Sequence, residues 1–188
     1  SALIGGAYGF FIQTGVEIFD GFSEAWGASL GDVAANTFGA TLAITQKLAW
    51  QEQRVWMKYS WSRSPFDQIR PNVLGSNFPE RILKDYNGQI YWASANINAF
   101  KPNSKWPKWL NIAVGYGADG MVGGDDNIFT SEGVEYDYTQ IARGRQFYIS
   151  PDIDLTRIKV KKVWQRAGLV VLNSLKFPLP GLEYHTND

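Results

Sequence analysis

The N-terminal part of the chain consists of long apolar runs interrupted by isolated polar positions. Residues 2–19 are apolar or small except for Gln13, Thr14 and Glu17, and small residues let helices pack closely. The run is slightly shorter than the about 20 apolar residues that span a membrane. It therefore predicts a buried or half-inserted helix, which we expect to end near Gly21 because glycine readily adopts the left-handed cap conformation.

A second helix is predicted to start at Ser29. Ser29 and Asp32 have the spacing of a capping box, in which the Ser oxygen satisfies free N–H groups at the start of the helix. No proline follows before Pro65, so the pattern predicts that this helix continues to about Trp61. Its second half places tryptophans beside basic residues, which suits a membrane interface or the end of a helix that packs on a sheet.

Beyond Gly88, apolar residues no longer follow the spacing of a helix and instead occur at every second position, as in a β-strand. Residues 63–87 are rich in Pro, Gly and Asn and predict a loop, with one short helix from Asn77 to about Tyr86. Alternating apolar and polar positions then predict antiparallel strands. The predicted strands cover residues 89–100, 109–118 and 145–155, with a further strand that begins at Leu182.

These elements together predict an α+β chain with an N-terminal helical hairpin. We expect a helical region over 1–62, a loop and short helix over 63–87, and an antiparallel β region over 88–188 that contains a helix over 156–175. We expect one domain that forms part of a longer protein, since the chain does not begin with Met and lacks a basic segment before its apolar run. Large apolar residues fall on one face of each strand, which is typical of a soluble one-sided sheet and of an outer-membrane β-barrel, and both stay open.

Composition narrows the function classes only in part. Aromatic residues make up 15% of the chain and charged residues only 19%, a balance that favours membrane-associated or sheet-rich proteins. The net charge is zero, so charge gives no argument for a nucleic-acid partner. Cysteine is absent, which rules out disulfides, thiolate zinc sites and cysteine nucleophiles.

Polar side chains recur at positions i, i+4 and i+7 in both predicted N-terminal helices. Residues 1–46 contain no Lys or Arg, and a buried carboxylate is costly unless it is paired. In an antiparallel hairpin the two polar stripes would meet in a pocket able to hold a lipid headgroup, a proton or a divalent metal. The alternative is purely structural: a helix cap, acids that face water, and an amide that bridges two helices. The candidate pocket residues are Gln13, Glu17, Asp20, Asp32, Asn36 and Gly39.

A basic cluster stands at the start of the predicted helix over 156–175, whose far end is apolar. Such a cluster suits anionic lipid headgroups, although a solvated helix start explains it equally well. The candidate membrane-surface residues are Lys159, Lys161, Lys162, Trp164 and Arg166.

Six segments carry a resemblance to a known family. They are Gly-Val-Glu-Ile-Phe-Asp (15–20), Ser-Leu-Gly-Asp-Val-Ala-Ala-Asn-Thr-Phe-Gly (29–39), Arg-Ser-Pro-Phe (63–66), Leu-Lys-Asp-Tyr-Asn-Gly-Gln (83–89), Gly-Tyr-Gly-Ala-Asp-Gly-Met (115–121) and Phe-Pro-Leu-Pro-Gly-Leu-Glu (177–183). They resemble the YfiM-like family of predicted periplasmic lipoproteins of unknown function, in particular its Bacteroidetes-type members. The spacing Glu-x-x-Asp … Ser-x-x-Asp-x-x-x-Asn-x-x-Gly is also similar to the VanZ-like membrane proteins. Those usually carry Gln at the position of Asp20 and an Arg in the next loop, whereas no Arg here precedes Arg54.

The resemblance implies a protein of the cell envelope, at the periplasmic face of the outer membrane, whose partner is a membrane lipid or an envelope protein. Two functions stay open. The first is a non-enzymatic scaffold or a lipid- or partner-binding protein. The second is an enzyme that modifies an envelope lipid or glycan through the carboxylate pocket. The first is favoured because the sequence has no serine-hydrolase elbow, phosphate loop or histidine cluster. No cofactor is predicted beyond the divalent metal that the pocket would accept.

Overall fold

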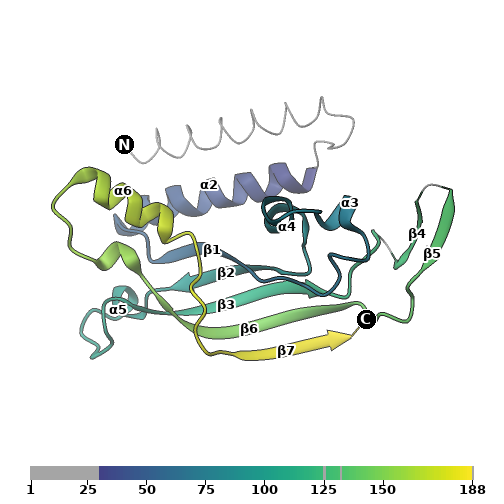
Figure 1. Cartoon of the computed structure of the whole chain (residues 1–188). Helices are drawn as coiled ribbons and strands as arrows, with labels where there is room; N and C mark the ends of the chain where they lie inside the picture. The colour runs from purple at the N-terminus through teal and green to yellow at the C-terminus, as the bar shows by residue number, and fades with distance from the viewer. Residues whose placement is uncertain (1–29, 125, 132, 188) are drawn as a thin grey trace. The chain divides into compact units, whose positions relative to one another are not determined.

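The structure is a computed structural model that describes residues 30–124, 126–131 and 133–187. The chain divides into two compact units, Ser1–Arg54 and Val55–Asp188. The described part of the first unit is a helix, and the second unit combines an antiparallel sheet with short helices (Figure 1). The predicted α+β class is therefore confirmed.

Helix α2 (Leu30–Trp50) is shorter than the sequence pattern predicted. Gln51 adopts a left-handed backbone conformation with φ of 60°, and Lys47 Nζ donates to its carbonyl oxygen at 2.6 Å, so the helix ends there. The prediction of helix as far as Trp61 is wrong. Residues Val55–Trp61 form strand β1 of the second unit, because β-branched and aromatic side chains fit a pleated, half-buried surface better than a helix.

The second unit is built on a five-stranded antiparallel sheet with the strand order β1-β2-β3-β6-β7, so β1 and β7 are its edges. The sequence located the three central strands and the start of the last one, but the strand predicted over 89–100 is too long, because Ile97–Phe100 form a short helix. The strands other than β1 are β2 (Gln89–Ala95), β3 (Leu110–Asp119), β6 (Gly144–Ile153) and β7 (Leu182–Asn187).

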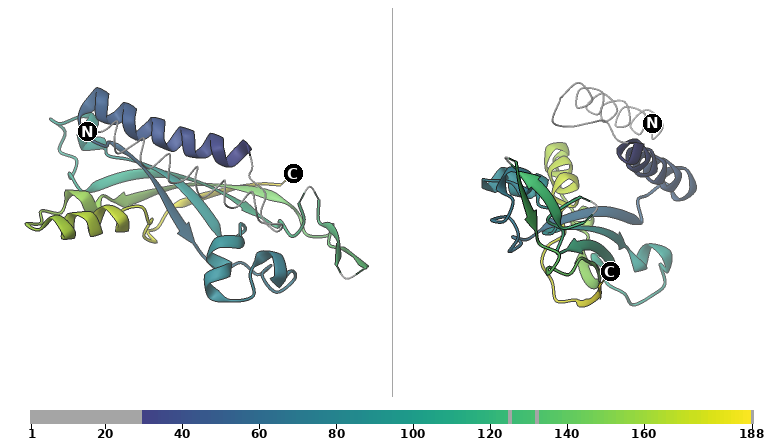
Figure 2. Two further views of the ribbon diagram at one scale, coloured as in Figure 1. Left: turned by 90° about the horizontal axis from the view of Figure 1, so that it is seen from above. Right: turned by 90° about the vertical axis from the view of Figure 1, so that its right-hand side faces the viewer.

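The connections contain short elements that the sequence partly anticipated. Asn77 caps α4, where its side chain accepts from the Glu80 N–H at 3.1 Å, which confirms the predicted helix start. The segment between β3 and β6 contains a hairpin that projects beyond the end of the sheet (Figures 1 and 2). The remaining elements are α3 (Pro71–Leu74), α4 (Phe78–Lys84), α5 (Ile97–Phe100), β4 (Ile128–Ser131), β5 (Val134–Asp137), the 3₁₀ turn η1 (Leu155–Arg157) and α6 (Val163–Leu172).

The predicted helix over 156–175 is too long at both ends. Asp154 caps η1 by accepting from the Thr156 N–H at 3.0 Å, and the chain is extended again at Ile158. Helix α6 begins only after Lys162, whose N–H donates to the Gln165 side chain at 3.3 Å. Two separate caps thus divide what reads as one helical segment in the sequence.

The sheet buries its small and polar side chains and exposes its large apolar ones. On β3, Asn111 and Ala113 are fully buried, whereas Val114 is 55% exposed and Tyr116 is 46% exposed. Strand pairing places Ser94, Trp92, Ser150 and Asp152 on the same face as Asn111 and Ala113. We call this the inner face, and the face of Val114 and Tyr116 the outer face. A soluble sheet with one face in water normally buries its large apolar side chains and exposes its polar ones.

A close approach explains why the inner face carries small residues. The Trp92 side chain lies across Gly115, where an added Cβ would be 2.7 Å from Trp92 Cε3. The Trp92 ring also packs against Tyr148, with ring centroids 5.6 Å apart. Glycine at position 115 therefore makes room for the largest aromatic side chain of the inner face.

The residues after α6 cross the inner face from one edge of the sheet to the other. Leu175 forms a parallel bridge with Tyr59 on β1, and the Lys176 N–H donates to the Tyr59 carbonyl at 2.8 Å. At the other end, Gly181 lies so close to β6 that an added Cβ would be 2.8 Å from the Ile149 carbonyl oxygen. We call residues 174–181 the crossing segment; it leads directly into β7.

Gly115→Ala is expected to destabilise the second unit by about 1–3 kcal/mol, because the new methyl group overpacks the core against the Trp92 ring. Gly168→Ala is the matched control. Gly168 lies inside α6 with no atom within 4 Å of its added Cβ, so this change is expected to be neutral or to stabilise by about 0.5–1 kcal/mol. Urea unfolding measures both. Equal effects of the two substitutions would show that Trp92 does not pack on Gly115.

Candidate functional site

The predicted helix-hairpin pocket falls largely outside the described residues. Gln13, Glu17 and Asp20 lie in the part of the chain that the structure does not describe. Asp32, Asn36 and Gly39 occupy positions i, i+4 and i+7 of α2, so these three positions share one face of that helix. The meeting of the two polar stripes stays a prediction.

The structure brings the five predicted membrane-surface residues together around the start of α6. Lys159, Lys161 and Lys162 precede the helix, Trp164 and Arg166 belong to its first turns, and all five are exposed. The Lys162 ammonium lies 5.9 Å from the centroid of the Trp164 ring, and the Trp164 side chain is 68% exposed. This exposed cationic and aromatic group is available to a negatively charged surface.

A buried ion pair, which sequence reasoning missed, lies on the inner face. Lys58 Nζ is 2.7 Å from Asp152 Oδ2, and both side chains are completely inaccessible to solvent. Lys58 is on β1 and Asp152 is on β6, with β2 and β3 between them. Three strand spacings amount to about 14 Å on a flat sheet, more than a lysine side chain spans, so the sheet must curve around its inner face.

Polar partners surround most of this ion pair, although Asp152 Oδ1 and Asn173 Nδ2 have no hydrogen-bond partner among the described residues. Lys58 Nζ also donates to the Ile153 carbonyl at 2.8 Å and to Asn173 Oδ1 at 3.1 Å. Ser94 Oγ donates to Asp152 Oδ2 at 2.5 Å, and Asn111 Nδ2 donates to Ser94 Oγ at 2.9 Å. Buried charges are tolerated when they are paired and hydrogen-bonded. The network joins β1, β2, β3 and β6 to the end of α6.

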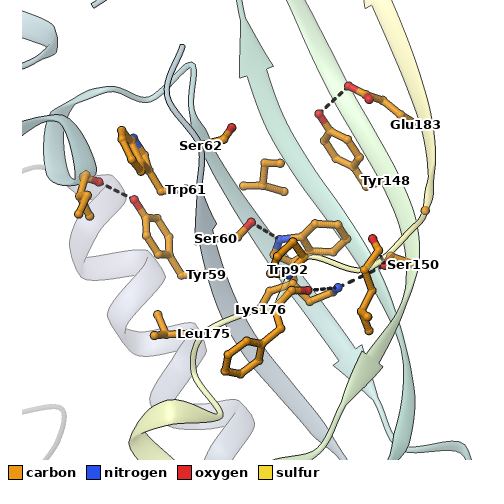
Figure 3. A pocket seen from close by; sticks show the side chains of 16 residues that line it. Tyr59, Ser60, Trp61, Ser62, Trp92, Tyr148, Ser150, Leu175, Lys176 and Glu183 are labelled. Carbon is orange, nitrogen blue, oxygen red and sulfur yellow. Dashed lines mark hydrogen bonds between the residues drawn. The ribbon is translucent and has the colours of Figure 1, made fainter. Parts of the chain in front are cut away.

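A cavity of about 620 Å³ opens beside the network, between the inner face and the crossing segment (Figure 3). Its walls come from β1, β2, β6, β7, α4 and the crossing segment, all within the second unit. Most of the wall is aliphatic or aromatic. The lining residues are Tyr59, Ser60, Trp61, Ser62, Ile82, Ile90, Trp92, Tyr148, Ser150, Leu175, Lys176, Phe177, Pro178, Leu179, Gly181 and Glu183.

Most polar groups in the cavity wall are already hydrogen-bonded to protein. Trp92 Nε1 donates to Ser60 Oγ at 2.8 Å, and Tyr148 OH donates to Glu183 Oε1 at 2.6 Å. The Tyr148 hydrogen bond is the main cause that lowers the pKa of Glu183, while burial is the main cause that raises the pKa of Tyr148. These pairs are consistent with a binding surface whose polar groups are fixed in place.

Lys176 is the ammonium group in the cavity wall, and it lies beside a serine. Its Nζ is 3.2 Å from Ser150 Oγ, a pairing that some hydrolases use for nucleophilic attack. Here, however, Ser150 is only 4% exposed. Its hydroxyl also lies within 3.4 Å of the carbonyl oxygens of Pro151, Leu179 and Pro180. Ser150 therefore anchors the crossing segment rather than facing a substrate.

The structure gives no indication of a metal site among residues 30–124, 126–131 and 133–187. This part of the chain contains no cluster of three or more His, Cys, Asp or Glu that could hold a metal ion. His185 lies on β7 and hydrogen-bonds Glu183. The divalent metal considered for the helix-hairpin pocket stays a prediction that involves residues outside this part.

The outer face is a continuous apolar surface over four strands. Tyr91 on β2 pairs with Tyr116 on β3, which pairs with Phe147 on β6, which pairs with Tyr184 on β7. The next row contains Val114, Ile149 and Leu182. All seven side chains are more than 40% exposed, and Leu182 is 75% exposed. Contiguous exposed apolar surface of this kind marks an interaction site in most proteins.

No family model, curated protein or solved structure matches this chain in the comparisons. The resemblance to the YfiM-like family therefore stays a prediction.

Lys58→Met is expected to destabilise the second unit by about 3–5 kcal/mol, because it leaves Asp152 as a buried charge without its closest cationic partner. Lys84→Met is the matched control: Lys84 Nζ lies 3.5 Å from Glu80 Oε2 in a partly exposed pair on α4, and such pairs contribute about 0–1 kcal/mol. Urea unfolding of both variants measures the difference. A Lys58→Met variant as stable as Lys84→Met would contradict the network described above.

Tyr148→Phe is expected to raise the pKa of Glu183 toward its ordinary value, because the largest influence that lowers it is the Tyr148 hydrogen bond. A lowered folded-state pKa stabilises the fold above the unfolded pKa of Glu183. That contribution is lost as the pH falls through the folded value, so Tyr148→Phe should reduce it. A carbon-13 NMR titration of the Glu183 carboxyl tests this, and an unchanged pKa in Tyr148→Phe refutes it.

Proposed function

We propose that this chain is a non-enzymatic protein of the cell envelope that binds a membrane lipid surface. The observation that carries the proposal is the outer face of the sheet, which presents Tyr91, Val114, Tyr116, Phe147 and Ile149 to the surroundings while the charged network lies inside. A sheet with polar side chains inside and large apolar side chains outside is stabilised when its exposed face leaves water.

Burial of the outer face supplies enough free energy to hold the protein on an apolar partner. Full burial of a large apolar side chain contributes roughly 1.5–3 kcal/mol. The exposed rows contain seven such residues that are only partly buried in the isolated chain. The rows from Tyr91 to Tyr184 and from Val114 to Leu182 contain no charged residue, so burial of these two rows would desolvate no ionic group of their own.

The exposed group around α6 favours lipid over an apolar protein as the partner. Lys159, Lys161 and Lys162 lie next to exposed Trp164 in the same unit. Lysines attract anionic headgroups, and tryptophan prefers the interface between headgroups and acyl chains. Helices of the described segments are too short or too polar to cross a bilayer.

The expected location, at the periplasmic face of the outer membrane, follows from the family resemblance and agrees with a lipid-binding role. An envelope protein remains the other partner that the resemblance implies. The enzymatic alternative, which modifies an envelope lipid or glycan, depends on the predicted helix-hairpin pocket, half of which lies outside the described residues. No feature among the residues that the structure describes favours it.

Flotation with vesicles tests this function. The chain is expected to float with vesicles of phosphatidylethanolamine and phosphatidylglycerol, and the double variant Val114→Asn/Ile149→Asn is expected to lose most of this association because polar groups replace apolar ones on the outer face. Leu83→Asn is the control, because Leu83 is an exposed residue on α4 that is 78% accessible and belongs to neither row of the outer face. A thermal unfolding curve confirms that each variant folds. Undiminished flotation of the double variant, or an equal loss in the control, would overturn the proposal.

A further inference from the structure

We propose that the cavity beneath the crossing segment binds a single-chain amphiphile with a carboxylate head, of the fatty-acid type, whose carboxylate pairs with Lys176 and whose chain lies along the apolar wall. This site is on the inner face, so it is separate from the outer face that carries the proposed function. The inference rests on charge, on hydrogen bonding at Lys176, and on the nature of the wall.

The charges at the end of the cavity next to Asp152 do not balance. Two lysines, Lys58 and Lys176, share one carboxylate, that of Asp152. Lys58 has the closer contact, at 2.7 Å from Oδ2, whereas Lys176 Nζ is 4.0 Å from Oδ1. The group therefore carries an excess positive charge in a region from which water is largely excluded. A buried cation of this kind is stabilised by an anion that enters beside it.

Lys176 also retains an unused donor. An ammonium group has three N–H donors, and Lys176 Nζ directs two of them to the Phe177 carbonyl at 2.9 Å and to Ser150 Oγ at 3.2 Å. Asp152 Oδ1, at 4.0 Å, is beyond hydrogen-bonding distance and accepts no hydrogen bond within the described residues. The Trp92 ring, 4.9 Å from Nζ, offers its face to the cation. A ligand carboxylate would take the remaining donor.

The pKa of Lys176 also reflects its burial and its position beside a second lysine. Burial is the main cause that lowers the pKa of Lys176, Asp152 opposes it, and Lys58 lowers the pKa further. A carboxylate bound at Nζ would offset the effect of burial and favour the charged ammonium. The geometry and the electrostatics therefore point to the same sign of ligand charge.

The rest of the cavity suits an acyl chain and orients it. Ile82, Ile90, Leu175 and Leu179 supply aliphatic wall. A methylene group occupies about the volume of a water molecule, roughly 30 Å³, so the cavity accommodates a chain on the order of a dozen carbons. Glu183, the acidic residue in the wall, lies away from Lys176 and is bonded to Tyr148 (Figure 3). Its negative charge disfavours a carboxylate at that end and directs the head toward Lys176.

Isothermal titration calorimetry with three probes of equal chain length tests the head group: dodecanoate, dodecanol and dodecylammonium, each below its micelle concentration. Dodecanoate is expected to bind the unaltered chain about tenfold or more tightly than dodecanol, as a hydrogen bond to a charged group predicts. Dodecylammonium is expected to bind most weakly. Equal affinities for dodecanoate and dodecanol would overturn the proposal without the use of any variant.

Variants then locate the site. Lys176→Met keeps the length of the side chain without its charge and is expected to remove the preference for dodecanoate over dodecanol, whereas Lys176→Arg is expected to retain it. Ile90→Phe, which fills the cavity, is expected to weaken both ligands. Val114→Asn/Ile149→Asn changes only the outer face and is expected to leave dodecanoate binding unchanged. If the outer-face variant loses dodecanoate while Ile90→Phe keeps it, the ligand binds the outer face and the cavity proposal fails, whatever the flotation experiment shows.

Discussion

The arrangement of the second unit depends on the ion pair between Lys58 and Asp152. Both side chains are completely inaccessible to solvent, and a buried pair depends on further hydrogen-bond partners for its charged groups. Asn173 and the Ile153 carbonyl provide them for Lys58, and Ser94 provides one for Asp152 Oδ2. The inner face of the sheet is polar because this pair requires polar neighbours.

The outer face follows from the same requirement. Side chains alternate between the two faces of a strand, so a strand that directs Asn111 and Ala113 inward must direct Val114 and Tyr116 outward. Curvature of the sheet, needed to bring β1 within reach of β6, leaves the apolar side chains on the convex side. The crossing segment closes the concave side, where Trp92 over Gly115 and Lys176 beside Ser150 border a cavity. One buried pair thus leads both to a surface suited to lipid and to an open cavity suited to a ligand.

Sequence pattern predicted the α+β class and the central strands, because twofold alternation and a cap such as Asn77 are local signals. It failed at Val55–Trp61, which reads as the continuation of α2 until the left-handed Gln51 ends that helix. The pattern also left open which face of the sheet would be buried, because that depends on Lys58 and Asp152, which are far apart in the sequence and have no shared local signal. The row Ala113, Gly115, Gly117 was the one sequence hint of a crowded inner face.

Solvent paramagnetic relaxation of methyl groups tests most directly whether the sheet buries its polar side. A soluble gadolinium chelate broadens NMR signals of methyl groups that water reaches, and the methyl groups of Ala113 and Val114 are neighbours in sequence on opposite faces of β3. We predict strong broadening for Val114, Ile149 and Leu182 and none for Ala113. A protected Val114 beside a broadened Ala113 would contradict the account.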